Sequence, residues 1–512
     1  MSAIITDNLK INNCTNFIND VTDGNYYTFI GLPNYNQYIA DWNTNTPDPV
    51  DNLDYLNSYE DSILGVKKIT SSDIIRVIPK IVWKTGIKYD MYRHDYSRYN
   101  TTVITGSTRL YDSKYYVMNK DYRVYICINN GSSPSNLNQG VISTSEPLHT
   151  SESPVELEDG YIWKYLYTIS PSDVLKFDST NYISVPNNWD TSTDAEISRI
   201  RDTAINGKIE TILIQKSTEY RISNPGLVNN VPIKGDGTGG FASVEFDENL
   251  KPIKVIVTNG GSGYTYATLD LNSIATPSGE KSIFDVIIPP RGGHGKNVYT
   301  ELGAYRALVY SRIENTITNP DFIEGNQFAR VGIIKDITYY QSNTLFGEST
   351  GSGVFGFIMD STVLESEDSS ITQQNTGAKG LLVSITEIGP SNSMVKYIVP
   401  RDKYLDTYSE GNTLKTTDPY FLNNNFAGLS TATSYDYRSF DTSSVIIGST
   451  QYNIMNFNGS QYGDVFLGQT FTAGLSNPDI NTKSGEIVYV DNRVSVTRQS
   501  QQREDIKIII EF

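Results

Sequence analysis

Apolar residues occupy every second position over several short stretches of the chain, which is the pattern of half-buried β-strands. The C-terminal stretch is the clearest case, with four large apolar residues at alternate positions: Ile506, Ile508, Ile510 and Phe512. Side chains two positions apart point to the same face of a strand. Chain ends fray unless packing holds them, so this pattern predicts a final strand with one buried face.

The residues just before this stretch predict further pairing. Residues 486–490 have the composition of a strand, and residues 491–493 are Asp-Asn-Arg, ahead of Val494 and Val496. Asp and Asn favour turns because their side chains hydrogen-bond to nearby backbone groups. Two or three paired strands are therefore expected to close the chain.

The segment EDGYIWKYLYTIS carries the sharpest local pattern. After a turn at Asp159 and Gly160, four aromatic residues fall on one strand face: Tyr161, Trp163, Tyr165 and Tyr167. A face of this kind either packs into a core or an interface, or stacks on sugars or bases. Packing is favoured because such rings bury a large area, and the pattern alone does not establish ligand binding.

A helix is predicted in the segment STDAEISRIRDTAIN. Thr193 and Glu196 have the spacing of a capping box, and Gly207 offers a stop. Three apolar residues share one helical face: Ile197, Ile200 and Ala204. The helix is short and is expected to connect two regions.

Two stretches of short strands, separated by Gly, Asn, Ser and Thr, predict small β modules at residues 208–290 and 347–479. The remaining segments are an N-terminal β-rich core at 1–207, a return to the core at 291–346, and C-terminal core strands at 480–512. No internal repeat of fixed period is found, which argues against a solenoid or propeller. The predicted fold class is mainly β, a multi-domain and β-sandwich-like core with inserted small β modules and a few short helices.

Composition narrows the functional classes. The 512 residues suffice for about three domains, and 36 Tyr with 39 Gly fit a β-rich globular protein. A formal net charge of −17 repels a phosphate backbone and argues against a nucleic-acid partner. Only Cys14 and Cys127 are present, so disulfides are not expected to hold the fold together. Neither an apolar run of ~20 residues nor a signal-peptide pattern occurs, so no membrane association or Sec-type export is expected.

Two short motifs suggest chemistry but lack its context. KGDGTGG at 234–240 has the glycines of a phosphate loop, yet the strand-like FASVEF follows where a helix is required, which favours a hairpin. His294 lies among glycines beside Arg291 and Lys296, where a base or an anion ligand is conceivable. Without an identifiable partner, His294 is predicted to be an ordinary loop residue.

Metal sites are not predicted. The chain has three histidines, which are far apart in sequence and have no zinc-binding spacing: His94, His149 and His294. The acidic residues at 48, 51 and 54 lack the glycine and terminal glutamate of a calcium loop. No cofactor-binding residue is identified either.

Catalytic residues are also not assigned. Three acidic residues precede the aromatic strand and would suit glycoside hydrolysis at the right separation, which the sequence does not reveal: Glu156, Glu158 and Asp159. No Gly-x-Ser-x-Gly element marks a serine nucleophile. The protein is therefore not expected to be an enzyme.

Several of these segments together resemble a known family. DSILGVKKI, VIPKIVW, YRVYICINN, EDGYIWKYLYTIS, NYISVPNNW, FARVGIIKDI and the closing SGEIVYVDNR and EDIKIIIEF occur in this order. They resemble the baseplate wedge subunit, known as gene product eight, of T-even-type contractile-tailed phages. The resemblance is concentrated in residues 61–189, in 303–336 and after 483, and it covers under half of the chain. The two modules have no counterpart in it.

The resemblance implies a mostly β subunit that forms a homodimer, binds neighbouring wedge proteins, and has no enzyme activity or cofactor. It implies a location in the tail baseplate of the virion, after assembly in the cytoplasm of the host bacterium. Two alternatives stay open. A host-surface or glycan-binding tail protein is favoured if the modules present aromatic grooves, and a polysaccharide-degrading tail enzyme requires paired carboxylates in a cleft.

Overall fold

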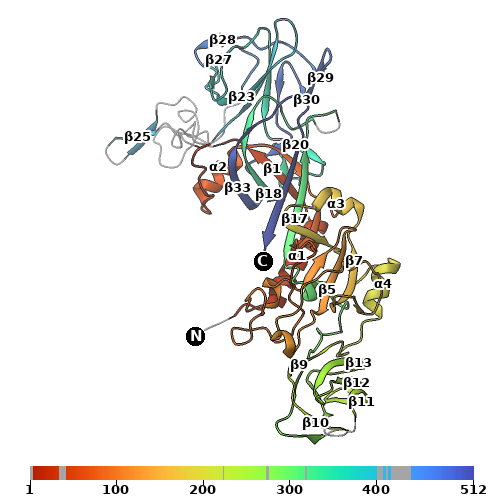
Figure 1. The fold of residues 1–512 in the computed structure, drawn as a ribbon. Helices are drawn as coiled ribbons and strands as arrows, with labels where there is room; N and C mark the ends of the chain where they lie inside the picture. The colour runs from red at the N-terminus through yellow and green to blue at the C-terminus, as the bar shows by residue number, and fades with distance from the viewer. Residues whose placement is uncertain are drawn as a thin grey trace. The chain divides into compact units, whose positions relative to one another are not determined.

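A computed structural model describes residues 4–33, 42–222, 224–271, 276–317, 320–400, 407–410, 413–416 and 440–512 (Figure 1). Strands far outnumber helices among these residues, and the strand pairs are antiparallel. The predicted mainly β fold class is therefore confirmed. The core is divided among several hydrophobic clusters, one of which contains residues of several sheets.

The chain forms two compact units, each assembled from segments that are distant in the sequence. The first unit contains residues 1–18, 75–308 and 508–512, and the second contains 19–74 and 309–507. The first predicted module thus belongs to the first unit and the second module to the second unit. The finer domain boundaries expected from the sequence stay a prediction.

Five α-helices occur in the described residues: α1 (Asp7–Asp23), α2 (Leu53–Asp61), α3 (Pro171–Phe177), α4 (Ala195–Asp202) and α5 (Val298–Leu302). Two short 3₁₀ turns are η1 (Leu110–Asp112) and η2 (Pro134–Asn136). Helix α1 is not among the predicted elements. The sequence pattern that indicates α1 is four apolar residues at helical spacing, all of which are buried in the structure: Ile11, Cys14, Ile18 and Val21.

Helix α4 confirms the predicted connector helix, but its cap is a different residue. The Asp194 side chain accepts hydrogen bonds from the backbone N–H groups of Glu196 (2.9 Å) and Ile197 (3.1 Å). Thr193, the predicted cap, precedes the cap position. A carboxylate at this position also complements the positive end of the helix dipole, which the Thr hydroxyl does not.

The first unit contains two four-stranded sheets. One has the order β4-β5-β7-β6, formed by β4 (Tyr116–Met118), β5 (Arg123–Asn129), β7 (Ile162–Thr168) and β6 (Val155–Glu156). The other has the order β13-β12-β11-β14, formed by β13 (Pro252–Ser262), β12 (Thr238–Phe246), β11 (Gly226–Gly235) and β14 (Ala267–Leu269). Two strand pairs complete this unit: β9 (Ile212–Lys216) with β16 (Ile283–Val286), and β10 (Tyr220–Arg221) with β15 (Thr276–Pro277).

A further four-stranded sheet has the order β34-β17-β3-β8. Its strands are β34 (Glu504–Glu511), β17 (Arg306–Ile313), β3 (Ile74–Pro79) and β8 (Tyr182–Val185). The chain passes from one unit to the other within α1, β3, β17 and β34.

The second unit contains a five-stranded and a seven-stranded sheet. The five-stranded order is β20 (Thr350–Ser352), β2 (Ile63–Lys68), β1 (Tyr26–Gly31), β18 (Gln327–Lys335) and β33 (Glu486–Thr497). The seven-stranded order is β28 (Thr450–Tyr452), β27 (Val445–Ile447), β22 (Ser370–Thr372), β23 (Lys379–Glu387), β24 (Ser393–Ile398), β21 (Phe355–Met359) and β31 (Leu475–Ser476). The remaining pairs are β19 (Thr338–Tyr339) with β32 (Ile480–Asn481), β29 (Gly459–Tyr462) with β30 (Val465–Phe471), and β25 (Thr407–Glu410) with β26 (Thr413–Thr416).

Strand β33 is continuous, so the turn predicted inside it is wrong. Arg330 of β18 lies opposite Asn492, whereas Phe328 lies opposite Val496, so β33 carries additional residues at this point. A bulge takes up such residues without reversing the chain. The Arg330 guanidinium Nε donates to the Asn492 side-chain oxygen at 2.9 Å, which fixes the turn-prone residue within the sheet.

The predicted final strand is confirmed as β34, but its apolar face is less completely buried than expected. Ile508 is 3% exposed, whereas Ile506 and Ile510 are half-buried. Phe512 is also half-buried, and its ring lies 5.5 Å from that of Phe17. The C-terminus is therefore packed against the fold up to its last residue.

Residues 208–290 have a hydrophobic cluster of their own, which extends from Ile209 to Val286. The two ends of this segment lie together, because the backbone N–H of Gly292 donates to the Asn206 side-chain oxygen at 2.8 Å. Strands β11, β12 and β13 lie side by side within it (Figure 1). The KGDGTGG motif connects β11 to β12, as the hairpin prediction requires.

Residues 347–479 share their packing with the rest of the second unit. Strand β20, near the start of this segment, pairs with β2. Leu381 and Val383 of β23 belong to the same buried cluster as Ile30 and Leu64, which lie outside the segment. The five-stranded sheet is thus completed and covered by residues of the second module.

Candidate functional site

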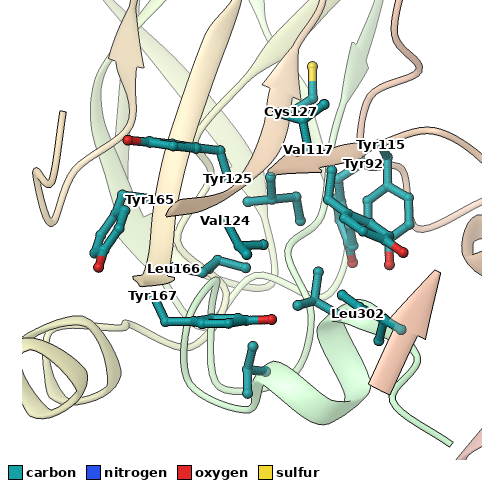
Figure 2. Close-up of a cluster of buried hydrophobic side chains, with 14 of the residues drawn as sticks. Tyr92, Tyr115, Val117, Val124, Tyr125, Cys127, Tyr165, Leu166, Tyr167 and Leu302 are labelled. Carbon is teal, nitrogen blue, oxygen red and sulfur yellow. The ribbon is translucent and has the colours of Figure 1, made fainter. Parts of the chain in front are cut away.

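The aromatic face of β7 is part of the core of the first unit. Its four aromatic residues are at most 1% exposed: Tyr161, Trp163, Tyr165 and Tyr167. Figure 2 shows Tyr165 and Tyr167 among other buried side chains that include Tyr125 and Leu166. Burial raises the pKa of the three tyrosines, so their hydroxyls stay protonated as donors. The Tyr167 hydroxyl, for example, donates to the backbone oxygen of Ser184 at 3.0 Å. This face is closed to sugars and bases.

The three acidic candidates before β7 have different roles. Asp159 organises a turn, because its carboxylate accepts from the backbone N–H groups of Thr144 (2.8 Å) and Ser145 (3.0 Å). The carboxylate of Glu156 pairs with the Lys254 ammonium at 2.8 Å. Glu158 is exposed. Glu156 and Asp159, but not Glu158, line a cleft of about 730 Å³ in the first unit.

His294 lies in the loop before α5, as predicted, but it is buried and has a partner. Its Nδ1 lies 2.6 Å from Oε1 of Glu301, and both side chains are nearly inaccessible to solvent. The other carboxylate oxygen of Glu301 accepts from the backbone N–H of Gly295 at 2.7 Å. The Tyr92 ring meets the imidazole edge to face at 4.6 Å. Helix α5 thus supplies the carboxylate that secures the glycine-rich loop, while Arg291 is exposed.

A small polar cavity of about 50 Å³ lies beside His294 and is also lined by Lys164 and Glu210. The Lys164 ammonium donates to the backbone oxygen of Glu152 at 2.7 Å and lies 4.0 Å from Glu210. By alternation along β7, Lys164 falls on the face opposite the aromatic residues, and Glu210 belongs to none of the sequence motifs. The cavity has the size and polarity to hold water but not a substrate.

A second buried polar group joins Lys396 to Asp321 and Asp479 in the second unit. Burial lowers the pKa of the Lys396 ammonium to about 7, although both carboxylates favour its charged form. Burial raises the pKa of Asp321 to about 6, and Thr350 and Asp479 hydrogen-bond to its carboxyl group. The Lys396 ammonium also donates to Gln469. Lys396 is only 2% exposed, so the network holds protons inside the fold and does not present an amine to a substrate.

The sequence patterns do not predict this network. Its members come from a loop, from β24 and from the segment before β32, and only the strand pairings of the second unit bring them together. A lysine within a run of strand residues ordinarily predicts an exposed position. The aliphatic neighbours of Lys396 in SMVKYIVP are the one local hint of burial.

The cysteines and the acidic residues near the N-terminus form no reactive or metal-binding site in the described residues. Cys14 and Cys127 are buried and free, and burial raises the pKa of Cys14 to about 11, which keeps the thiol protonated. Asp54 lies in the first turn of α2, which is capped by Asn52. In the described parts of the chain, no three His, Cys, Asp or Glu residues are grouped to hold a metal ion. None of the described helices combines the length and the apolar character needed to cross a membrane.

No protein-family model and no curated protein matches the chain. The function is therefore inferred from the residues and their geometry.

Proposed function

We propose that the chain is a structural subunit of the baseplate wedge of a contractile-tailed phage. In this role it forms a homodimer and binds neighbouring wedge proteins while the tail assembles. It has no catalytic activity and needs no cofactor. Its location is the baseplate of the virion, after assembly in the cytoplasm of the host.

The arrangement of the family-like segments is the observation that carries this proposal. DSILGVKKI, FARVGIIKDI and SGEIVYVDNR are far apart in the sequence, yet they supply β2, β18 and β33 of one five-stranded sheet. In the first unit, YRVYICINN and EDGYIWKYLYTIS supply the paired strands β5 and β7. If the resemblance arose by chance, the matching segments would not be expected to be neighbouring strands. Within each unit, the family-like segments thus form neighbouring strands of one sheet.

The use of the candidate catalytic side chains also supports a structural role. Asp159 holds a turn, Glu156 is paired with Lys254, and His294 is buried against Glu301. A general acid or base must reach its substrate, whereas His294 is buried and the Asp159 carboxylate is taken up by backbone N–H groups. Glu156 lines the cleft, and its pair with Lys254 is half-exposed. Large sheets with many loops provide contact surface for other proteins.

Fractionation of virions tests the proposal. Virions of the phage that encodes the chain are disrupted gently, baseplates are purified by sedimentation, and the chain is detected with an antibody. We expect the chain to sediment with the baseplates, and we expect light scattering of the isolated chain to give the mass of a dimer. Recovery only in the soluble fraction, together with hydrolysis of a host polysaccharide, would instead support a tail enzyme. Release of the chain with the host-receptor complex would support a glycan-binding protein.

A further inference from the structure

The amine of Lys396 is buried in the second unit with few partners. An ammonium group carries three N–H donors, and each of them needs an acceptor when the group is buried. In the described part of the chain, the side-chain oxygen of Gln469 is the one hydrogen-bond acceptor of Lys396. The Nζ atom also lies over the Phe471 ring, 5.5 Å from its centre. Burial lowers the pKa of Lys396 to about 7, so the neutral, nucleophilic amine is well populated at neutral pH.

The side-chain amide of Gln469 is held in one orientation. Its Nε2 donates to the backbone oxygens of Val354 (2.6 Å) and Asn477 (2.9 Å). Its oxygen is thereby left to contact the Nζ atom of Lys396. Gln469 is 3% exposed and Lys396 is 2% exposed. An amine and an amide therefore meet at a place that is nearly closed to solvent.

Gly356 makes room for this contact. It lies on β21, directly opposite Lys396 of β24. A Cβ atom at position 356 would lie 3.0 Å from the Phe471 ring and 3.5 Å from the side-chain oxygen of Gln469. Strand β30, which carries Gln469, thus packs closely against the backbone of β21. Because β30 pairs with β29 and is not a strand of the seven-stranded sheet, the contact joins two sheets.

Two carboxyl groups lie near the amine. The side chains of Asp321 and Asp479 hydrogen-bond to each other, which requires a proton on one of them. Burial raises the pKa of both groups, and this favours the shared proton. Both carboxyl groups favour the charged form of Lys396, but burial of the amine outweighs them. The pair keeps an exchangeable proton in the surroundings of the amine.

We propose that Lys396 and Gln469 form an intramolecular isopeptide bond once the chain has folded. The Nζ atom of Lys396 attacks the side-chain carbon Cδ of Gln469, so that the Nζ–Cδ bond forms and the Cδ–Nε2 bond breaks. A proton from Nζ passes to Nε2, which leaves as ammonia, and the reaction consumes no other reagent. The product amide has one N–H donor in place of three, which removes the poorly satisfied buried ammonium.

The bond would tie β30 to β24 across the two sheets. A covalent link between residues distant in the chain restricts the unfolded state, as a disulfide does. Both cysteines are free, so neither of them provides such a link. The inference does not rest on the proposed baseplate role, because the covalent structure of the isolated chain is measured without the virion. Failure of one proposal is therefore distinguishable from failure of the other.

Intact-mass spectrometry of the purified full chain tests the bond. We expect a mass about 17 Da below that of the sequence, once the N-terminal residue has been assigned, because one ammonia is lost. Trypsin does not cleave after an acylated lysine, so digestion should give a branched peptide that contains both Lys396 and Gln469. A folded chain with the full sequence mass, or a loss of ammonia without the branched peptide, would overturn the proposal.

Three variants assign the loss of ammonia to this pair. Lys396→Met removes the amine, and Gln469→Asn shortens the amide side chain by one methylene, so both are expected to have the full mass of their sequences. Lys379→Met changes a half-buried lysine on the neighbouring strand β23 and is expected to keep the mass deficit. Thermal unfolding checks that the variants are folded, and the branched peptide of the unmodified chain decides the question even where a variant is not. A deficit that persists in folded Lys396→Met would overturn the proposal.

Discussion

At the scale of single residues, buried polar groups distinguish this protein from a simple set of apolar cores. The His294 and Glu301 pair and the Lys396 group both lie inside the fold and depend on partners from other elements. A buried polar group that loses its partner costs more free energy than the contact contributed. These residues are therefore the places where single substitutions have large effects.

The His294 pair gives the first prediction. His294→Ala removes the partner of one buried oxygen of Glu301, and we expect it to lower the free energy of unfolding by about 2–4 kcal/mol. Arg291→Ala, three positions away at an exposed site, should change it by less than about 0.5 kcal/mol. Urea unfolding followed by fluorescence measures both. Equal stability of the two variants would show that the pair contributes nothing to the fold.

Asp321 gives a prediction about pH. Its pKa rises from an ordinary value near 3.8 to about 6 on folding, so the folded state holds the proton more tightly than the unfolded chain. The stability from this group is present below pH ~4 and is lost as the pH rises through about 6. Asp321→Asn mimics the protonated form at every pH, so the variant should gain stability relative to the unmodified chain between pH 4 and 7. We expect the gain to be on the order of 2–3 kcal/mol.

Unfolding free energies of both proteins across this pH range test the claim. Curves that run parallel from pH 4 to 7 would show that Asp321 titrates alike in the folded and unfolded states. A variant that loses stability as the pH rises would point to a required negative charge beside Lys396.

At the scale of elements, the C-terminal strand shows that the burial of alternating apolar residues depends on the neighbouring elements. The pattern identifies β34, yet only Ile508 of its alternating isoleucines is fully buried. Burial depends on what lies above each position of the strand, and the strand pattern carries no information about those neighbours. Residues at equivalent positions in the pattern therefore contribute unequally to the free energy of unfolding.

This inequality is testable by substitution along β34. Ile508→Ala should lower the free energy of unfolding by about 2–4 kcal/mol, because it leaves a cavity in the core. Ile510→Ala, at a half-buried position, should cost less. Glu511→Lys breaks a pair between an exposed Glu511 and a largely buried Arg306, and it should change the free energy of unfolding by about 1 kcal/mol or less. Thermal unfolding ranks the three variants. A larger loss for Ile510→Ala than for Ile508→Ala would contradict the observed burial.

At the scale of the whole molecule, the two predicted modules differ in how they join their units. Most buried apolar residues of 208–290 form a cluster of their own, and only Leu213 and Ile287 join the main core of the first unit. Asn206 and Gly292 hold the two ends of the segment together. Residues 347–479 share a cluster with Ile30 and Leu64 and supply β20 to the main sheet. A segment with its own core and adjacent ends is removable at little cost in closure entropy, whereas a segment that completes a core is not.

Deletion of each module gives the final prediction. Replacing 208–290 by a short Gly-Ser linker should leave a soluble, cooperatively folded protein with the near-ultraviolet circular dichroism of its remaining aromatic core. Replacing 347–479 in the same way should cause aggregation, because Ile30, Leu64 and the edge of β2 become exposed. Soluble yield and thermal melts distinguish the outcomes. A folded chain without 347–479 would show that this module is as separable as the first.

Local patterns account for much of the fold and little of the candidate site. The alternation at β34, the aromatic face of β7 and the glycine-rich hairpin between β11 and β12 all follow from short-range rules of strand and turn formation. The turn wrongly predicted within β33 and the cap of α4 show where those rules admit two outcomes. At both places a specific contact decides, through Arg330 in the first case and Asp194 in the second.

The sequence by itself determined that the chain is mainly β, that its end is a strand, and that its aromatic strand packs inward. These properties depend on the period of apolar positions and on turn chemistry, which act between residues close in the chain. Only the tertiary structure decided that Glu301 meets His294 and that Lys396 is buried with Asp321. Such contacts arise from the pairing order of strands distant in sequence, and no local pattern specifies that order.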